Sequence, residues 1–207
     1  MIKWLSNYWY HYKFRTIICA FLIVILGVTV YEFATTEKYD MKVYLYLSQS
    51  VSSEVEHSLE TTVEQYYEQD GKQINVQVIN FSYDPYSASG DSRVAFASAL
   101  AGELTMKEHF IYITDEYRFE ELDNNDVFTN VFQQNKLFNK YDNKAYSLKG
   151  GNFEKKFIEN LKKNNVVVEK MPKLYISVLT PPEKDSANYK NYVSAEKLVE
   201  LIVKKDR

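Results

Sequence analysis

Residues 41–47, MKVYLYL, form a continuous strand signal in which both alternating faces are apolar or aromatic. In such a strand, Val43 and Leu45 point to one face of the sheet, and Tyr44 and Tyr46 point to the other. Strands with two apolar faces are typical of sheets that carry helices on both sides. The run therefore predicts a central strand of an α/β domain.

A helix is predicted directly after this strand. Ser53 and Glu56 have the spacing of a capping box, in which each side chain binds a backbone amide at the start of a helix. Gly71 stands where this helix is expected to stop. Apolar residues recur at every fourth position along one helical face, namely Val51, Val55, Leu59, Val63 and Tyr67.

The alternation of strand and helix continues beyond this helix. Residues 74–81, INVQVINF, predict a second strand, and residues 109–114, HFIYIT, predict a third. Between them, a helix capped by Asp91 or Ser92 is expected to run through AFASALAGEL. Strands joined by helices through short connections imply right-handed crossovers. The predicted fold class is α/β, a three-layer domain with a mainly parallel sheet.

The second half of the domain has weaker signals. The expected elements are a helix at 127–138, a short strand at 144–148, a helix at 153–163 capped by Asn152, a strand at 174–179 and a helix at 192–205. The last helix is amphipathic, and the side chains expected to face the core are Val193, Leu198, Leu201 and Ile202.

An uncharged apolar run, residues 16–31, precedes the domain. Sixteen helical residues rise roughly 24 Å, so a membrane span of roughly 30 Å must extend to residue 34. The flank before it carries Lys3, Lys13 and Arg15 without any acid, and aromatic residues suited to a membrane interface. By the positive-inside rule, the N-terminus is then cytoplasmic and the C-terminal domain extracellular.

These signals divide the chain into a flank (1–15), a transmembrane helix (16–34), a stalk (35–40) and an extracytoplasmic domain (41–207). Two alternatives to a single-pass anchor remain. A cleaved signal peptide would need a small-x-small site, which the end of the run lacks because Glu32 precedes Ala34 by two residues. A buried helix of a soluble protein is the other, since the run is shorter than 18 residues.

The composition of the exported part excludes several classes of function. Its 22 basic residues, after the three of the flank are removed, face 28 acids, which gives a formal charge of −6. This charge argues against nucleic acid or anionic lipid as the main ligand. The single cysteine, Cys19, lies in the apolar run, so the domain has neither a disulfide nor a thiolate metal site.

The candidate binding site follows from the expected sheet. In parallel sheets, ligands meet the carboxyl ends of strands, where loops and helix N-termini converge. This rule selects three loops, which contribute Ser48, Gln49 and Ser50, then Tyr83, Asp84 and Tyr86, and finally Asp115, Glu116 and Tyr117. Hydroxyls, tyrosines and carboxylates suit a polar or cationic ligand, or a peptide. Alternatively, these residues only cap helices and form turns.

Other patterns do not predict a metal or cofactor site. The acidic residues between Asp115 and Asp126 lack the spacing and the glycine of a calcium loop, which favours a solvated acidic face. Residues 149–152, KGGN, lack the full phosphate-loop pattern and favour a helix-initiating turn over an anion site. No histidine has a metal-ligand partner four residues on, and no serine lies in a GxSxG motif. We expect no metal, no cofactor and no enzymatic activity.

Several segments resemble one lobe of a type II periplasmic solute-binding protein. The order VYLYL, a Ser-rich helix start, VQVINF, an Ala-rich helix and HFIYITD is similar to the first part of such a lobe. The tail LYISVLTPPEKDSANYKNYVSAEKLVELI is similar to its returning strand and helix. The whole layout, including WYHYKFRTIICAFLIVI, resembles uncharacterised single-pass membrane proteins of Firmicutes more closely. The resemblance implies a binding role, but the domain has no room for the second lobe that closes over solute.

We therefore predict a bacterial single-pass cell-membrane protein whose extracytoplasmic domain acts through binding. Its expected partners are the lipid bilayer and an integral membrane protein, for which the chain is an accessory subunit. A low-affinity receptor for a small polar solute or peptide of a transport system is the second hypothesis. The third is a cell-surface enzyme that uses Asp84, Asp115 or Glu116 as an acid or base.

Overall fold

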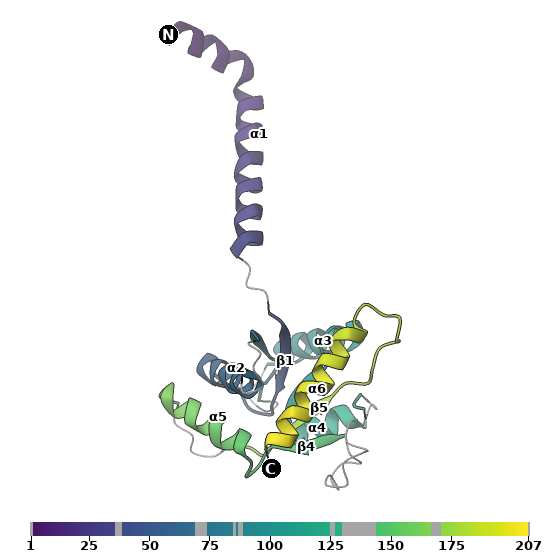
Figure 1. Cartoon of the computed structure of the whole chain (residues 1–207). Helices are drawn as coiled ribbons and strands as arrows, with labels where there is room; N and C mark the ends of the chain where they lie inside the picture. Colours follow the sequence, from purple (N-terminus) through teal and green to yellow (C-terminus); the bar gives the residue numbers. More distant parts are fainter. Residues whose placement is uncertain are drawn as a thin grey trace. The chain divides into compact units, whose positions relative to one another are not determined.

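The computed structural model describes residues 2–35, 39–68, 74–84, 86, 89–124, 127–129, 144–166 and 171–206. The chain divides into two compact units, Met1–Lys38 and Tyr39–Arg207 (Figure 1). In the described residues, the first unit is a single helix and the second is an α/β domain.

Helix α1 (Ile2–Thr35) contains the predicted span, residues 16–34. Its segment Tyr12–Tyr31 is 20 residues long, strongly apolar and nowhere buried. At about 1.5 Å of rise per residue, this segment is about 30 Å long, which matches the hydrocarbon core of a bilayer. The helix is therefore compatible with a membrane anchor, and a signal sequence has the same properties.

The described domain contains one sheet with strand order β2-β1-β3-β5-β4. Its strands are β1 (Met41–Tyr46), β2 (Val76–Asn80), β3 (Ile111–Asp115), β4 (Ala145–Ser147) and β5 (Leu174–Val178). All five lie where the sequence predicted a strand, with ends shifted by at most two residues. The two apolar faces of β1 are explained by its interior place between β2 and β3.

One strand of the described sheet runs against the others. β1, β2 and β3 are parallel, with Val43 opposite Val78 and Ile111, but β5 runs antiparallel to both β3 and β4. The described sheet is therefore mixed: four of its five strands run in one direction, as a mainly parallel sheet requires, and β5 runs opposite to them, which the prediction did not specify. Side chains alternate in the same way in both kinds of pairing, so the sequence LYISV does not encode the direction of its strand.

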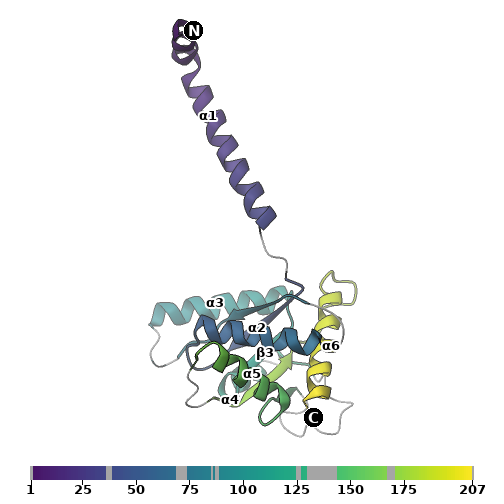
Figure 2. The same ribbon diagram turned by 60° about the vertical axis from the view of Figure 1, so that its left-hand side comes forward.

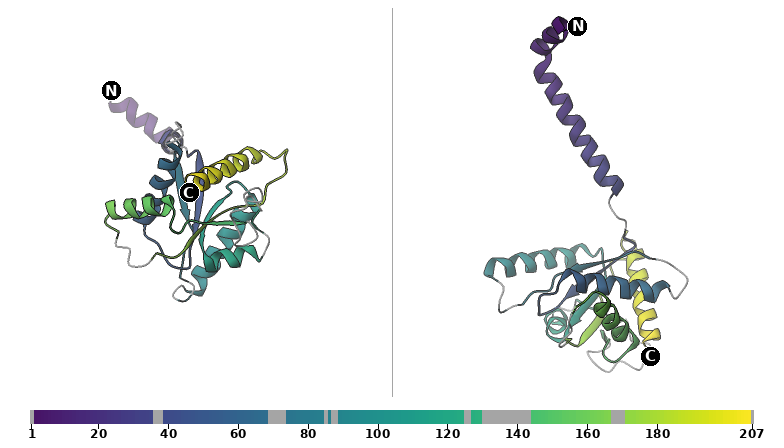
Figure 3. Two further views of the ribbon diagram at one scale, coloured as in Figure 1. Left: turned by 60° about the horizontal axis from the view of Figure 1, so that its bottom comes forward. Right: turned by 90° about the vertical axis from the view of Figure 1, so that its left-hand side faces the viewer.

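Helices cover both faces of this sheet. One face packs against α2 (Ser53–Glu68), α5 (Asn152–Lys163) and α6 (Tyr189–Lys205), and the other against α3 (Gly90–Met106) and α4 (Glu116–Asp123). Figure 2 shows α2 and α5 side by side, where the rings of Tyr66 and Phe153 lie 5.3 Å apart. Figure 3 shows the two groups of helices on opposite sides of the strands. The tyrosines Tyr44 and Tyr46 of β1 point toward α3 and α4.

Acidic side chains of α2 protect the free edge of β2. Ser53 is the first residue of α2, and the predicted capping box is wrong because Glu56 reaches β2 instead. Successive turns of α2 place three carboxylates along the strand. They pair as Glu56 with the Asn80 side chain at 2.8 Å, Glu60 with the Val78 amide at 2.8 Å and Glu64 with the Val76 amide at 3.0 Å. Satisfying outward amides in this way removes a template for edge-to-edge pairing.

The start of α3 also differs from the prediction. Ser89 is the N-cap, and its Oγ accepts a hydrogen bond from the amide of Ser92 at 3.2 Å. The predicted caps Asp91 and Ser92 therefore lie in the first turn of the helix. Serine and aspartate are both common at this position, so residue type alone does not fix which one begins the helix.

Helix α5 is capped by the far end of the domain. Asn152 is its first helical residue and donates to the carbonyl of Lys205, so the prediction that Asn152 is the cap is wrong. Instead, Asp206 Oδ1 accepts a hydrogen bond from the Phe153 amide at 2.6 Å. A Cβ atom on Gly151 would lie 2.0 Å from Asp206 Oδ2, so only glycine leaves room for this carboxylate. The KGGN turn therefore starts a helix, as predicted, and the Asp206 carboxylate accepts a hydrogen bond at the start of that helix.

Two other predicted helices compare as follows. The predicted helix at 127–138 lies mostly outside the described residues, and of its described part Phe128 forms a bridge with Leu179. Helix α6 begins three residues before its predicted start, at Tyr189. Leu198 and Ile202 are buried as predicted, whereas Val193 and Leu201 are only partly buried.

Candidate functional site

The predicted site lies at the carboxyl edge of the sheet, where β1, β2 and β3 end. The amide and the hydroxyl of Ser48 both donate to Asp115 Oδ2, the amide at 2.7 Å, and so join the first and third loops. The loop after β2 joins them through Ser82, whose Oγ accepts from the Leu47 amide at 2.9 Å. The parallel arrangement of these strands thus brings the three predicted loops together.

Asp115 is the last residue of β3 and the N-cap of α4. Its Oδ1 accepts a hydrogen bond from the amide of Arg118 at 2.9 Å, so both carboxylate oxygens are engaged within the chain. Glu116 and Tyr117 are the first residues of α4, and the prediction of a loop at these positions is wrong. An aspartate at the end of a strand begins the next helix at once when its side chain caps the first turn.

Arg118 fills the space between the three loops, and its side chain is only 1% exposed. Its Nη1 donates to the Tyr46 hydroxyl at 2.9 Å and to Glu121 Oε2 at 2.7 Å, and its Nη2 donates to the Tyr83 carbonyl at 3.1 Å. A buried guanidinium is costly unless it is paired and hydrogen-bonded. We call Arg118, Tyr46, Tyr83 and Glu121 the Arg118 cage.

Aromatic rings enclose the guanidinium of the cage. Its central carbon lies 4.5 Å from the ring centroid of Tyr46 and 4.2 Å from that of Tyr83, distances typical of cation–π contacts. Tyr83 in turn stacks on Phe96 of α3 at 5.2 Å, with 9° between the ring planes. Burial lowers the pKa of Arg118, but the hydrogen bond to Glu121 and the nearby charges raise the pKa above its ordinary value. The cage therefore holds a permanent charge that links β1, α3 and α4.

The remaining predicted residues are more accessible. Gln49 and Ser50 are exposed, and so are Glu116 and Tyr117 on α4. Asp84 Oδ1 accepts a hydrogen bond from the amide of Tyr86 at 2.8 Å, and this turn leaves the Tyr86 side chain 93% exposed. At the carboxyl edge, the predicted residues thus separate into engaged ones, namely Ser48 with Asp115 and Tyr83 in the Arg118 cage, and a more accessible rim around them.

The sequence-based prediction missed Arg118, Tyr46, Phe96 and Glu121. The one available signal was a single basic residue in the otherwise acidic segment EYRFEELD, three positions before an acid. That spacing predicts a surface ion pair on a helix, which is weak evidence for a site. The burial of Arg118 depends on rings from two other elements, so it is not readable from one segment.

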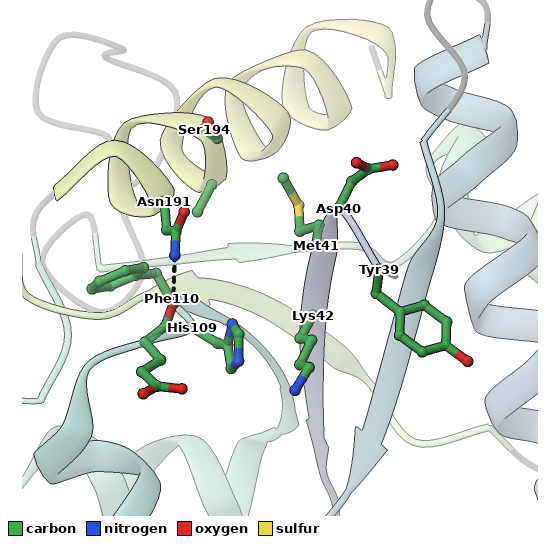
Figure 4. Close-up of a pocket in the computed structure, with 10 residues that line it drawn as sticks. Tyr39, Asp40, Met41, Lys42, His109, Phe110, Asn191 and Ser194 are labelled. Carbon is green, nitrogen blue, oxygen red and sulfur yellow. Dashed lines mark hydrogen bonds between the residues drawn. The ribbon is translucent and has the colours of Figure 1, made fainter. Parts of the chain in front are cut away.

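A second hollow lies at the opposite, amino edge of the sheet (Figure 4). This amino-edge cleft has a volume of about 170 Å³. Its walls come from the start of β1, the residues just before β3 and the first turns of α6. The polar residues that line it are Asp40, Lys42, Glu108, His109, Asn191 and Ser194. The sequence-based rule pointed to carboxyl ends, and it therefore selected none of these residues.

Lys42 and His109 are the unpaired groups of this cleft. Neither the Lys42 ammonium nor the His109 ring forms a hydrogen bond or ion pair with another residue in the described part of the chain, whereas the backbone of Lys42 belongs to β1. Burial lowers the pKa of His109, and the nearby Lys42 ammonium lowers it further, against the opposite influence of Glu103 and Glu108. The imidazole rests beside Tyr44, with ring centroids 5.9 Å apart. The acceptors around it are partly used, since Asp40 accepts the Asn75 amide at 3.0 Å.

Helix α3 forms a third notable surface. Leu100 is its buried residue, while Val94 is 66% exposed and Met106 is 53% exposed. Most of the intervening positions are alanine, glycine or serine, so the exposed side of the helix carries little charge. In Figures 2 and 3, one end of α3 extends beyond the elements around it. An exposed apolar helix of this kind is typical of an interaction surface.

The acidic segment after β3 is part of α4 rather than a metal loop. Asp123 accepts a hydrogen bond from Lys144 at 2.8 Å, and Asp126 lies outside the described residues. Among the described residues, no group of three or more histidine, cysteine, aspartate or glutamate side chains has the arrangement of a metal site. Comparison with family models, curated proteins and solved structures finds no match to this chain.

Proposed function

We propose that this chain is a membrane-anchored accessory subunit whose extracytoplasmic domain binds an integral membrane protein. Helix α1 supports the anchor, because its 20-residue segment Tyr12–Tyr31 is strongly apolar on average and is not buried in the chain. Lys3, Lys13 and Arg15 support a cytoplasmic N-terminus, which places the α/β domain outside a bacterial cell. The short stalk, residues 35–40, favours a partner that is itself at the membrane.

The observation that carries partner binding is the exposed apolar side of α3. In this 17-residue helix, Leu100 is fully buried, and Phe96 and Leu104 are partly buried against the core, so much of its surface is left uncovered by its own domain. Val94 and Met106 are exposed apolar residues near the two ends of this helix and would gain from being covered by another surface. A transmembrane partner with an apolar external face is the occupant that such a side suits, because small residues allow two helices to approach closely.

A receptor for a small polar solute or peptide is the second candidate function, and the amino-edge cleft favours it. The resemblance to a binding-protein lobe adds support, since it implied a returning strand and helix at the end of the chain, and β5 and α6 form such a pair. Binding is favoured over cell-surface catalysis because Asp115, a candidate acid or base, is already engaged by Ser48 and Arg118.

The test of the leading proposal is co-purification from native membranes. We expect gentle detergent extraction of the tagged full chain to recover an integral membrane protein in stoichiometric amount. Val94→Asp adds one negative charge to the exposed side of α3 and should release the partner without unfolding the domain. Lys162→Gln changes the net charge equally on the exposed part of α5 and should keep the partner. Recovery of the monomer alone in repeated extractions would remove the proposal.

The orientation has a separate test. We expect protease added to intact protoplasts to digest the chain beyond Asp40 while the segment 1–13 stays protected. The basis is the basic, acid-free flank before the apolar run. Protection of the C-terminal domain would reverse the topology.

A further inference from the structure

A hollow with a surplus of positive charge lies where parts of three helices meet. Figure 1 shows the end of α6 beside the start of α5, and Figure 2 shows α5 along α2. The volume of the hollow is about 240 Å³, more than about tenfold what one water molecule needs, so it has room for a polyatomic ion. We call it the α5 hollow. It is lined by Tyr66 of α2, by Asn152, Lys155, Lys156 and Glu159 of α5, and by Lys205 of α6.

Two lysines of the α5 hollow are held in place by neutral groups. The Lys205 ammonium donates a hydrogen bond to the Tyr66 carbonyl at 3.1 Å, and the Lys156 ammonium lies 5.0 Å from the centroid of the Tyr66 ring. A carbonyl oxygen and an aromatic face both attract a cation, but neither carries a net charge. The two ammonium groups are therefore positioned without being neutralised.

The third lysine, Lys155, is exposed, and its ammonium has no partner among the described residues. Three other lysines of the domain lie against carboxylates instead, namely Lys144 at 2.8 Å from Asp123, Lys163 at 3.1 Å from Glu159 and Lys204 at 3.8 Å from Glu200. The α5 hollow thus gathers three lysines that no carboxylate of the described chain compensates by direct contact.

The acids around the hollow leave this surplus in place. Glu159, the one acid among the described lining residues, is paired with Lys163. Asp206 and Glu154 lie nearby, and each accepts a hydrogen bond from a backbone amide near the start of α5. The charge of Asp206 still reaches Tyr66, because burial first and this carboxylate second raise the pKa of Tyr66 to about 12. The lining carries three positive charges against one, and a positive surplus remains when Lys163, Asp206 and Glu154 are counted.

We propose that the α5 hollow binds a small soluble oxyanion that is compact and doubly charged, such as a phosphate or a sulfate group. Lysine acts as a point charge with rotatable donors, whereas a planar carboxylate is best matched by the fork of arginine, which no described lining residue supplies. The charge of −6 on the exported part opposes a long polyanion, but it does not oppose one small ion held in a hollow. An ion in this position would bridge α2, α5 and α6.

This inference goes beyond the proposed function. The hollow belongs to the helices on one face of the sheet, whereas α3, which carries the proposed partner surface, covers the opposite face. It also needs no particular placement of the domain relative to α1. Ion binding and partner binding can therefore fail separately.

The test is a titration of the full chain followed by nuclear magnetic resonance. The chain is labelled with nitrogen-15 at lysine, delipidated in dodecyl maltoside and titrated at about pH 8, where phosphate is a dianion. Inorganic phosphate, sulfate and succinate are added in separate arms, with chloride keeping the ionic strength constant. The amide resonances of Lys155, Lys156 and Lys205 report on the hollow, and that of Lys42 at the amino edge is the reference.

We expect saturable shifts of the three resonances with phosphate and with sulfate, and weaker binding of succinate, whose two charges are far apart. Lys155→Gln should weaken phosphate binding by about fivefold, the upper effect of losing one exposed ion pair. Glu159→Gln should strengthen phosphate binding by about twofold, because it removes the acid of the lining and frees Lys163. Lys162→Gln removes an exposed lysine of α5 outside the lining and should bind as the wild type does.

Three results would overturn the proposal. The first is the absence of saturable shifts with both phosphate and sulfate. The second is an affinity that neither Lys155→Gln nor Glu159→Gln changes, although their spectra in chloride alone show that both variants are folded, because the charge of the hollow would then not hold the ion. The third is binding of succinate as tight as that of phosphate, which would assign the hollow to carboxylates.

Discussion

The two edges of the sheet treat their charged residues in opposite ways. At the carboxyl edge, Arg118 is buried, and its guanidinium is held by Tyr46, Tyr83 and Glu121. At the amino edge, Lys42 faces a cleft without a partner in the described residues. The polar groups of the carboxyl edge join its own loops, whereas at the amino edge the Lys42 ammonium has no partner among the described residues, although other polar groups there are hydrogen-bonded. An edge whose groups bind one another stabilises the fold, and an edge with free groups is the better place for a ligand.

The largest expected effect on stability comes from replacing Arg118, the central residue of the carboxyl edge. Arg118→Met keeps an apolar stem but loses the hydrogen bonds to three residues, and should lower the free energy of unfolding by about 3 kcal/mol. The value lies at the low end for a buried pair because Glu121 is 47% exposed and regains water. Both tryptophans precede residue 16, so near-ultraviolet circular dichroism of the tyrosines during denaturation is the suitable measurement.

The control for this variant is Lys162→Met, which alters an exposed residue of α5 and should change the free energy of unfolding by less than about 0.5 kcal/mol. Equal stability of Arg118→Met and the wild type would show that the cage does not hold the loops together.

A smaller loss of stability is expected from a change at the start of α5, beyond the carboxyl end of β4. Gly151→Ala places a methyl group on the Asp206 carboxylate and should displace it from the Phe153 amide. Loss of such a cap costs about 1 kcal/mol in the free energy of unfolding. In an Asp206→Ala background, the same change should cost much less, since no carboxylate remains to be displaced. Additive losses in the double variant would contradict this explanation.

The smallest effect on stability is expected at the amino edge, and its size depends on pH. Because the pKa of His109 is lowered in the folded state, the unfolded chain binds the proton first as the pH falls. The wild type should therefore lose stability as the pH falls through about 6.5, the ordinary pKa of histidine, toward the lower folded pKa. His109→Gln should lose less over that interval, whereas His57→Gln, which alters an exposed histidine, should follow the wild type. The measurement is the denaturation midpoint between pH 8 and pH 5.

The strands and most helices could be predicted from the sequence because they depend on local patterns. The two apolar faces of MKVYLYL predicted a strand buried on both faces, and β1 is buried and lies between β2 and β3. The direction of β5 could not be predicted, because a short apolar strand has the same pattern in either pairing. The N-caps Ser89 and Gly151 lie one to three residues before the predicted caps, because several neighbouring residue types suit the same role.

The candidate sites were harder to predict than the fold. The carboxyl-edge rule brought Ser48 and Asp115 together correctly, but it did not reveal that each already binds the other. Arg118 was missed because its cage draws on three elements. Lys42 and His109 were missed because they become neighbours only through the register of β1 against β3, in which Val43 lies opposite Ile111. Proximity that arises from register cannot be read from either segment alone.

The most direct test of the contrast between the edges compares the loss of one cation at each. Arg118→Met removes the guanidinium that three residues hold at the carboxyl edge, and Lys42→Met removes the ammonium that has no partner among the described residues at the amino edge. The measurement is the free energy of unfolding of both variants, from denaturation followed by near-ultraviolet circular dichroism. We predict a loss of about 3 kcal/mol for Arg118→Met and a change of less than about 0.5 kcal/mol for Lys42→Met. Equal losses in the two variants would contradict the account in which the carboxyl edge, unlike the amino edge, uses its charge to hold the fold together.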